Sequence, residues 1–238
     1  MRVLVAGVDT STQSCKVELR DATDFSLVAR GTAAHPPVTP PRSEQNPEDW
    51  WRAFVAAFRS AMADAPAGSR VAAISVGGQC HGLVPLDGEG IPLRPAKLWN
   101  DTTTAPDLEP LIARVGAERF IERTGSLPPA AFTISKLAGL AAHEPDVLRA
   151  LRTALLPHDY LNFRLTGERV TDRSEASGTG YFDADANEYV WEFLEAVSPE
   201  PDWPSIVPRV AGPDEVVGVL HADPLRELGL TGDVAVGA

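Results

Sequence analysis

Val3-Leu4-Val5-Ala6-Gly7-Val8 opens the chain after Met1-Arg2, and six polar residues follow it, Asp9-Thr10-Ser11-Thr12-Gln13-Ser14. The near-continuous apolar run predicts a strand buried on both faces. Beyond the polar segment, Cys15, Val17 and Leu19 alternate with charged residues, which is typical of a strand with one solvated face. Residues 9–14 are therefore predicted to form a hairpin loop.

The next segments extend this hairpin into an α/β domain. A third strand is expected at 25–34, before a proline-rich connection at 36–41 that cannot donate ladder hydrogen bonds. Asn46-Pro47-Glu48-Asp49 predicts a helix start, because Asn is a good N-cap and Pro fits the first helical position. Its apolar face comprises Trp51, Phe54, Val55, Phe58 and Met62.

The middle of the chain adds strands, and the rest is mainly helical. A second strand buried on both faces is predicted at 71–76, and short strands at 83–86 and 96–99 flank a turn at 87–90. Helical spacing or capping signals mark residues 133–142, 145–151, 159–166 with Gly167 as C-cap, 172–177, 188–197 and 224–228. We expect functional loops at the strand ends.

Composition narrows the function classes. The 238 residues carry 33 acidic and 21 basic side chains, a net charge of −12, which argues against binding to a nucleic acid. Cys15 and Cys80 lack metal-ligand spacing and are expected to be free thiols in the core. No signal-peptide region and no apolar run of about 18 residues is present, so the expectation is a cytoplasmic protein that does not bind membranes.

The loop at 9–14 carries chemistry suited to a nucleotide phosphate. Backbone N–H groups and the hydroxyls of Thr12 and Ser14 can donate to phosphate oxygens, and Asp9 can hold Mg²⁺ through water. The alternative is that Asp, Thr and Ser are ordinary turn residues. The loop does not follow the Walker A pattern.

Two further groups of polar residues suit a sugar. Gln79 and His81 lie between glycines just past a predicted strand and could hydrogen-bond sugar hydroxyls. Trp99-Asn100-Asp101 combines a flat aromatic surface with two polar groups. A lone histidine or tryptophan is more often a structural residue, so neither group is decisive alone.

Taken together, the ordered motifs resemble the FGGY family of carbohydrate kinases, and specifically its xylulokinases. The matching stretches are Gly7–Ser14, Ser43–Trp51, Gly78–Gly82, Leu98–Asp101, Phe132–Leu137, Leu155–Leu161, Leu165–Gly167 and Thr171–Gly180. The resemblance implies an actin-like ATPase (ribonuclease H-like) α/β fold, of which this chain would be the first of two domains. It also implies transfer of the ATP γ-phosphoryl group to the terminal hydroxyl of a pentulose, most simply D-xylulose.

The resemblance assigns roles to individual residues. Asp9 would be on the magnesium and phosphate side, and Thr12, Gln13 and Ser14 would line the path of the phosphate. The sugar side would comprise Gln79, Cys80, His81, Trp99, Asn100 and Asp101. Thr103 stands where the family often has arginine, so a contact from that side chain is in question. ATP and Mg²⁺ are the implied cofactors, a small sugar is the implied partner, and a full-length homodimer is compatible with the family.

The far end of the chain leads to an expectation about domains. Residues 234–238 read as the opening of a buried strand. The prediction is a sugar-side domain at 1–232 and, at 233–238, the start of a nucleotide-side domain. In the family the catalytic base follows such a strand, so we expect it beyond Ala238 and a catalytically incomplete chain; Asp233 is not assigned that role.

Two alternatives stay open at this point. One is a non-catalytic sugar-binding or regulatory remnant of a sugar kinase. The other is a kinase for another substrate, such as L-ribulose or gluconate, because the stereochemistry of hydroxyl groups is recognised by pocket geometry.

Overall fold

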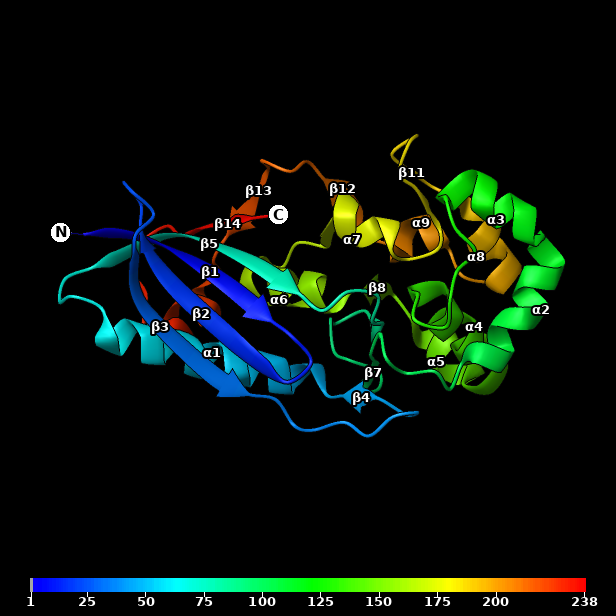
Figure 1. Cartoon of the computed structure of the whole chain (residues 1–238), viewed down its shortest axis with the longest axis horizontal. Coiled ribbons are helices and arrows are strands. Elements are labelled where there is room, and N and C mark those ends of the chain that lie inside the picture. The colour runs from blue at the N-terminus through cyan, green and yellow to red at the C-terminus, as the bar shows by residue number, and fades with distance from the viewer. Residues whose placement is uncertain (1) are drawn as a thin grey trace.

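A six-stranded mixed sheet forms one half of the molecule, and short helices form the other half (Figure 1). The computed structural model describes residues 2–238. The sheet order is β13 (Val216–Val219), β14 (Ala235–Gly237), β5 (Arg70–Gly78), β1 (Val3–Thr10), β2 (Ser14–Asp21) and β3 (Leu27–Ala34). β5 runs parallel to both β1 and β14, and the other neighbours are antiparallel.

The predicted hairpin is confirmed, with a shorter loop. β1 continues through Asp9 and Thr10, and β2 begins at Ser14, so the loop itself is residues 11–13. Its closure comes from Ser11, whose backbone N–H donates to Ser14 O over 3.0 Å. The polar side chains at 9–14 therefore lie at one end of two paired strands.

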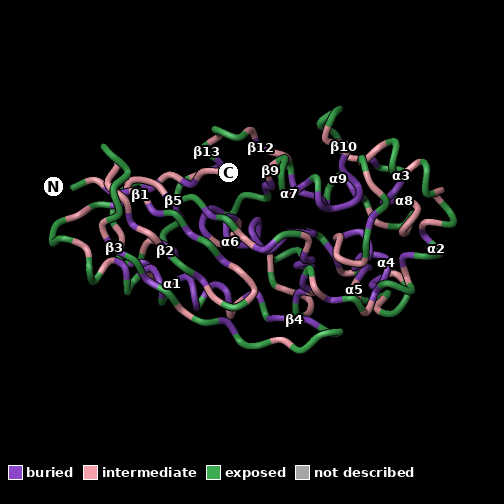
Figure 2. The backbone as a smooth tube through the Cα atoms, in the orientation of Figure 1, coloured by how far each residue is buried: buried purple, intermediate pink, exposed green. Residues whose placement is uncertain are grey.

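The prediction that β1 and β5 are buried on both faces is wrong. Leu4, Ala6, Val8 and Thr10 are buried, whereas Gly7 and Asp9, which alternate with them, are exposed. β5 also has exposed residues among its buried ones (Figure 2). The reason is that helices cover only one face of the sheet. A run of small and apolar residues does not by itself distinguish one-sided from two-sided burial.

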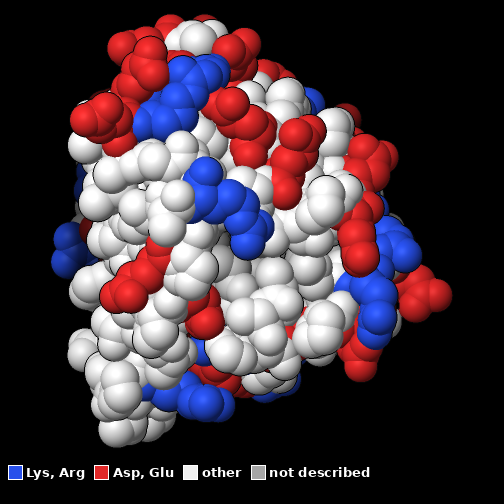
Figure 3. Space-filling view, turned by 90° about the vertical axis from the view of Figure 1, so that its right-hand side faces the viewer, with Lys and Arg blue, Asp and Glu red and all other residues white. Residues whose placement is uncertain are grey.

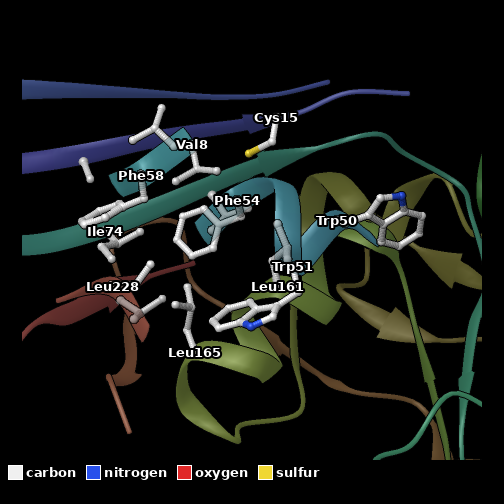
Figure 4. Close-up of a cluster of buried hydrophobic side chains, with 14 of the residues drawn as sticks. Val8, Cys15, Trp50, Trp51, Phe54, Phe58, Ile74, Leu161, Leu165 and Leu228 are labelled. Atoms are coloured by element: carbon white, nitrogen blue, oxygen red, sulfur yellow. The ribbon is translucent and has the colours of Figure 1, made fainter. Parts of the chain in front are cut away.

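Helix α1 (Pro47–Asp64) begins where the sequence predicts and packs on the covered face. The Asn46 side chain accepts from the backbone N–H of Glu48 over 3.0 Å, as an N-cap does. Close packing on β3 requires a glycine, because a Cβ at Gly31 would lie 1.8 Å from Ala57 O. The shared core joins α1, α6 (Pro157–Thr166) and α10 (Ala222–Leu228) to the strands (Figure 4).

The helical half has its own hydrophobic core. Its helices are α2 (Ala105–Val115), α3 (Ala117–Thr124), α4 (Thr133–His143), α5 (Pro145–Ala150), α8 (Trp191–Val197) and α9 (Trp203–Ile206). The sequence analysis has no counterpart for α2 and α3, and Pro110 inside α2 masks the helical pattern. Residues 188–197 divide into a short strand and α8 rather than forming one helix.

The chain also forms four two-stranded ladders and the short helix α7 (Arg173–Ser177). The ladders are β4 (Glu44–Gln45) with β7 (Ala96–Lys97), β6 (Val84–Leu86) with β8 (Thr153–Leu155), β9 (Val170–Asp172) with β12 (Arg209–Ala211), and β10 (Phe182–Asp183) with β11 (Glu188–Tyr189). β6 and β7 were expected to flank one turn; each instead pairs mainly with a distant strand. Long-range partners decide such short pairings.

β14 lies inside the six-stranded sheet. Ala235 and Val236 pair with Ala73 and Ile74 of β5, and Val236 is fully buried. Residues 233–238 were expected at the start of a separate domain, and their strand is hydrogen-bonded here to β5 and β13. In the described structure, β14 is a part of this first sheet.

Candidate active site

Thr12 connects the loop predicted to bind phosphate with the residues predicted to bind sugar. Its hydroxyl donates to Gln79 Oε1 over 3.1 Å and accepts from Trp99 Nε1 over 3.0 Å. The backbone N–H of Gln79 also donates to Thr10 O over 2.9 Å. Three segments that are far apart in the sequence therefore meet at the end of β1 and β5.

Two residues that sequence reasoning missed hold the tip of the hairpin. Gln45 Nε2 donates to Thr12 O over 3.0 Å, and Gln45 Oε1 accepts from Trp50 Nε1 over 2.7 Å. His35 Nδ1 lies 2.9 Å from Ser11 O. Gln45 lies in a quoted motif, but only the fold shows what it contacts; His35 has no local signal. Both are buried, so the loop has a fixed shape.

The phosphate-side residues divide by exposure. The Asp9 side chain is 61% exposed, with Lys16 Nζ 3.9 Å away, so its carboxylate faces solvent. No protein group in residues 2–238 hydrogen-bonds the side chain of Gln13 or the hydroxyl of Ser14. Thr12 differs from the prediction, because its single hydroxyl proton is already donated to Gln79.

The donor set around Asp9 fits magnesium that keeps most of its water. Residues 2–238 contain no cluster of three or more His, Cys, Asp or Glu side chains able to hold a metal ion. Mg²⁺ is usually bound by one or two carboxylates together with waters and substrate phosphates. An exposed carboxylate at the end of a strand suits that mode of binding.

A pocket of about 690 Å³ opens beside this hairpin, a size typical of small-ligand sites. Its lining residues are Ser11, Thr12, Gln13, His35, Pro37, Val38, Pro40, Trp99 and Asn100. Trp99 is 44% exposed although its indole nitrogen is bound to Thr12, so part of its ring remains accessible. Aromatic faces of this kind stack on the apolar faces of ligands.

His81 occupies a constrained turn after β5. Its φ of 64° lies in the left-handed region, and its ring centroid is 4.7 Å from that of Phe132. The Thr133 hydroxyl donates to His81 O over 3.1 Å. Burial lowers the pKa of His81, so the ring is neutral at pH 7 and offers one donor and one acceptor nitrogen. Strain of this kind is concentrated at functional sites.

Cys80, by contrast, does not lie in the core. Cys15 is buried as expected, but Cys80 is exposed. β5 ends at Gly78, so the alternation of buried and exposed residues no longer applies two residues later. Burial of the sulfur, with Glu175 nearby, raises the pKa of Cys80, and the group is a thiol at neutral pH.

Asp101 is positioned differently from the other sugar-side residues. It is fully buried, and its carboxylate accepts from the backbone N–H groups of Ser43 and Thr103 over 2.8 and 3.0 Å. Although burial acts to raise it, these hydrogen bonds lower the pKa of Asp101 overall. Asp101 therefore shapes the turn that presents Trp99 and Asn100, and its carboxylate is held by groups of the protein.

Lys97 supplies the cation next to Asp101. Its ammonium lies 3.4 Å from the Asp101 carboxylate and 2.9 Å from Glu44, and it donates to the Thr103 hydroxyl over 2.9 Å. Thr103 is the position where arginine was expected from the family pattern. Here Lys97, four residues before Asp101, neutralises the Asp101 carboxylate.

A buried polar cluster lies beneath the turn at 79–82. His158 Nδ1 is 3.1 Å from Asp159 Oδ1, and a Cβ at Gly78 would be 3.0 Å from His158. Burial raises the pKa of the neighbouring Glu175 to about 7. These residues lie in motifs that match the family, but no role of the cluster was predicted, because α6 and α7 bring it together only in the fold.

Several buried polar atoms near the site have no partner within residues 2–238. They are Gln79 Nε2, Asn100 Oδ1, His81 Nδ1 and His35 Nε2. Buried polar atoms are nearly always hydrogen-bonded in proteins. These four atoms around one pocket and turn keep hydrogen-bonding capacity that the described protein groups do not use.

Replacing Thr12 with valine is expected to release the Trp99 indole. The change removes both hydrogen bonds of the hydroxyl, each worth about 1 kcal/mol. We expect the Trp99 indole N–H to exchange with solvent about tenfold faster, measured by NMR. In the matched control Ser11→Ala, on the same loop, Trp99 exchange should stay unchanged; equal rates in Thr12→Val and wild type would contradict the connecting role of Thr12.

Comparisons with known proteins place the chain among sugar kinases. The sequence profile of the FGGY family of carbohydrate kinases, N-terminal domain, matches residues 4–238. The xylulose kinase of Streptomyces rubiginosus is 47% identical over 219 residues, covering 92% of this chain and 44% of that protein. The chain thus spans about half the length of the curated relatives it matches.

Solved structures agree with this placement. The xylulose kinase from Bifidobacterium adolescentis superimposes with a TM-score of 0.85 at 36% identity, over 99% of this chain and 52% of that one. The xylulose kinase from Rhodospirillum rubrum gives 0.89 at 29% identity, over 99% and 48%. The predicted actin-like fold is confirmed.

The surface charge and the helices have two further features. The end of the molecule formed by the helical half shows acidic and basic side chains interspersed, with no extended basic area on that face (Figure 3). Across residues 2–238, no helix combines the length and apolar character that crossing a bilayer requires.

Proposed function

The chain belongs to the FGGY family of carbohydrate kinases, and from that premise we propose that it forms the sugar-side half of a kinase that phosphorylates D-xylulose with ATP. The observation that carries the proposal is the hydrogen-bonded chain from Trp99 through Thr12 to Gln79. It puts the loop suited to phosphate and the residues suited to sugar hydroxyls on one wall. Phosphoryl transfer needs this juxtaposition, because the rate depends mainly on positioning.

Each side chain has a defined task in this proposal. Asn100, Gln79 and His81 hydrogen-bond the hydroxyls, since each has a buried polar atom without a protein partner in the described chain. Trp99 packs on the carbon skeleton of the sugar, and Cys80 borders it. Asp101 and Lys97 hold the Trp99 turn in place.

The phosphate side consists of Asp9 together with Gln13 and Ser14. Their side chains face outward from the hairpin and can hold the nucleotide phosphates with magnesium, which when bound neutralises charge on the transferring group. Thr12 takes part through its position rather than by donating its proton. Further parts of the proposal are a separate nucleotide-binding half in the whole protein, a cytoplasmic location and a homodimer of the whole protein.

Sugar binding to this chain tests the proposal. Isothermal titration with D-xylulose, L-ribulose, gluconate and glycerol should give the tightest binding with D-xylulose. His81→Ala should weaken that binding by one to two orders of magnitude, the range expected when hydrogen bonds to a polar ligand are lost. The surface variant Asp223→Ala should bind as the wild type does.

Two outcomes would support the alternative functions. Tighter binding of L-ribulose or gluconate would identify a kinase for that substrate. D-xylulose binding without sugar-dependent ADP release from Mg-ATP by the whole protein would favour a sugar-binding or regulatory role. Absence of binding to every sugar tested would contradict the proposal.

A further inference from the structure

Lys136 is fully buried and has no carboxylate within ion-pair distance in residues 2–238. Its Nζ instead donates to two backbone carbonyls, Ala130 O and Ala131 O, each over 2.6 Å. Burial lowers its pKa to about 7. The charge of Asp101 opposes this shift and that of Lys97 adds to it, but no ion pair forms in the described chain. An interior ammonium held by two carbonyls is costly, so this is an unusual use for a lysine.

The segment held by Lys136 is one wall of the His81 site. Ala130 and Ala131 lead directly into Phe132, whose ring packs on His81, and into Thr133, whose hydroxyl donates to His81 O. The Ser135 hydroxyl also donates to Ala130 O over 2.6 Å. Gly178 also lies against the His81 ring, where a Cβ would be 2.2 Å from the imidazole.

The position of His81 therefore depends on how residues 130–133 are fixed. The left-handed backbone of His81 is not stabilised by a regular element, because β5 has already ended. His81 is contacted by Phe132, from the loop before α4, and by Thr133, the first residue of α4. The loop in turn is tied to α4 by the Lys136 side chain.

We propose that Lys136 is a positioning residue of the sugar site, which holds Ala130–Phe132 against His81 and so orients the imidazole toward the ketose hydroxyls. This inference rests on the proposed function for the identity of the ligand. The contact chain from Lys136 to His81 stands independently of it. A lysine suits the task because one nitrogen can donate to two neighbouring carbonyls, which methionine of similar length cannot do.

The test compares Lys136→Met with Leu148→Ala, a core variant on α5 in the hydrophobic cluster of the helical half. In Lys136→Met we expect D-xylulose affinity to fall at least tenfold and the His81 ring signals to move in NMR spectra recorded without sugar. Leu148→Ala should lose stability while keeping its His81 signals and its affinity within twofold. Lys136→Gln, which can still donate hydrogen bonds, should fall between Lys136→Met and the wild type.

The readouts separate the two proposals. Shifted His81 signals in Lys136→Met, together with no sugar binding by the wild type, would overturn the sugar-kinase function and support the positioning role. Unchanged His81 signals and affinity in a folded Lys136→Met or Lys136→Gln protein would overturn the positioning role.

If neither variant folds, NMR of the wild-type protein with isotopically labelled lysine tests the positioning role. The lysines of the chain are Lys16, Lys97 and Lys136, so the buried one is readily distinguished. A shift of the Lys136 signal in the presence of saturating D-xylulose would support the coupling, and its absence despite binding would overturn it.

Discussion

Replacing Asp101 with alanine is expected to destabilise the chain by about 3 kcal/mol, because removing one partner of a buried ion pair leaves the others uncompensated. The Ser43 and Thr103 backbone N–H groups would lose their acceptor, and Lys97 would keep only Glu44 and the Thr103 hydroxyl. Chemical denaturation followed by fluorescence measures the loss. A decrease below about 1 kcal/mol would contradict the role assigned to this carboxylate.

The same substitution should also weaken the hydrogen bond of the Trp99 indole, two residues away. Without the carboxylate the turn at 98–103 loses the hydrogen bonds that define it, so the indole should no longer reach Thr12. Asp183→Ala is a matched control, since Asp183 also accepts from backbone N–H groups and an arginine, but far from the site. It should leave the Trp99 indole N–H signal unchanged.

A second large effect is expected from Gly178→Ala, on sugar binding. A Cβ at this position would lie 2.2 Å from both Cε1 and Nδ1 of His81. The backbone of Gly178, with φ of −89°, accepts alanine without strain, so the imidazole must move. We expect D-xylulose affinity to fall by at least tenfold, with a stability loss of about 1–2 kcal/mol from overpacking.

Gly212→Ala provides the control for that substitution. The nearest atom to a Cβ there is Asp214 Oδ1 at 3.8 Å, which is ordinary contact. Titration calorimetry and denaturation of both variants separate the effects. If Gly178→Ala bound D-xylulose as well as Gly212→Ala does, His81 would not be a sugar ligand in this position.

The local elements of the fold were predictable because their signals lie within a few residues. The alternation of Cys15, Val17 and Leu19 marks β2, and Asn46 with Pro47 marks the start of α1. Gly167, with φ of 76°, ends α6 where expected. Each of these depends on backbone geometry and capping, which a short stretch of sequence encodes directly.

Burial and strand partners were less predictable. The exposed face of β1 and β5 and the pairing of β6 with β8 depend on which elements pack nearby. Cys80 became exposed because a strand ended two residues before it. The sequence of β14 is that of a buried strand whether it belongs to this sheet or begins another domain. Only its hydrogen bonding to β5 assigns it to this sheet.

The sequence by itself determined the fold class, the family resemblance and the residue types available for binding phosphate and sugar, because those follow from motifs of contiguous residues. The tertiary structure alone decided what these residues do for one another. In the folded chain, Trp99 is hydrogen-bonded to Gln79 through Thr12. Asp101, which was predicted to bind sugar, is buried, and Lys136 holds the segment that contacts His81. These relations depend on contacts between residues tens of positions apart, and such contacts exist only after two cores have packed.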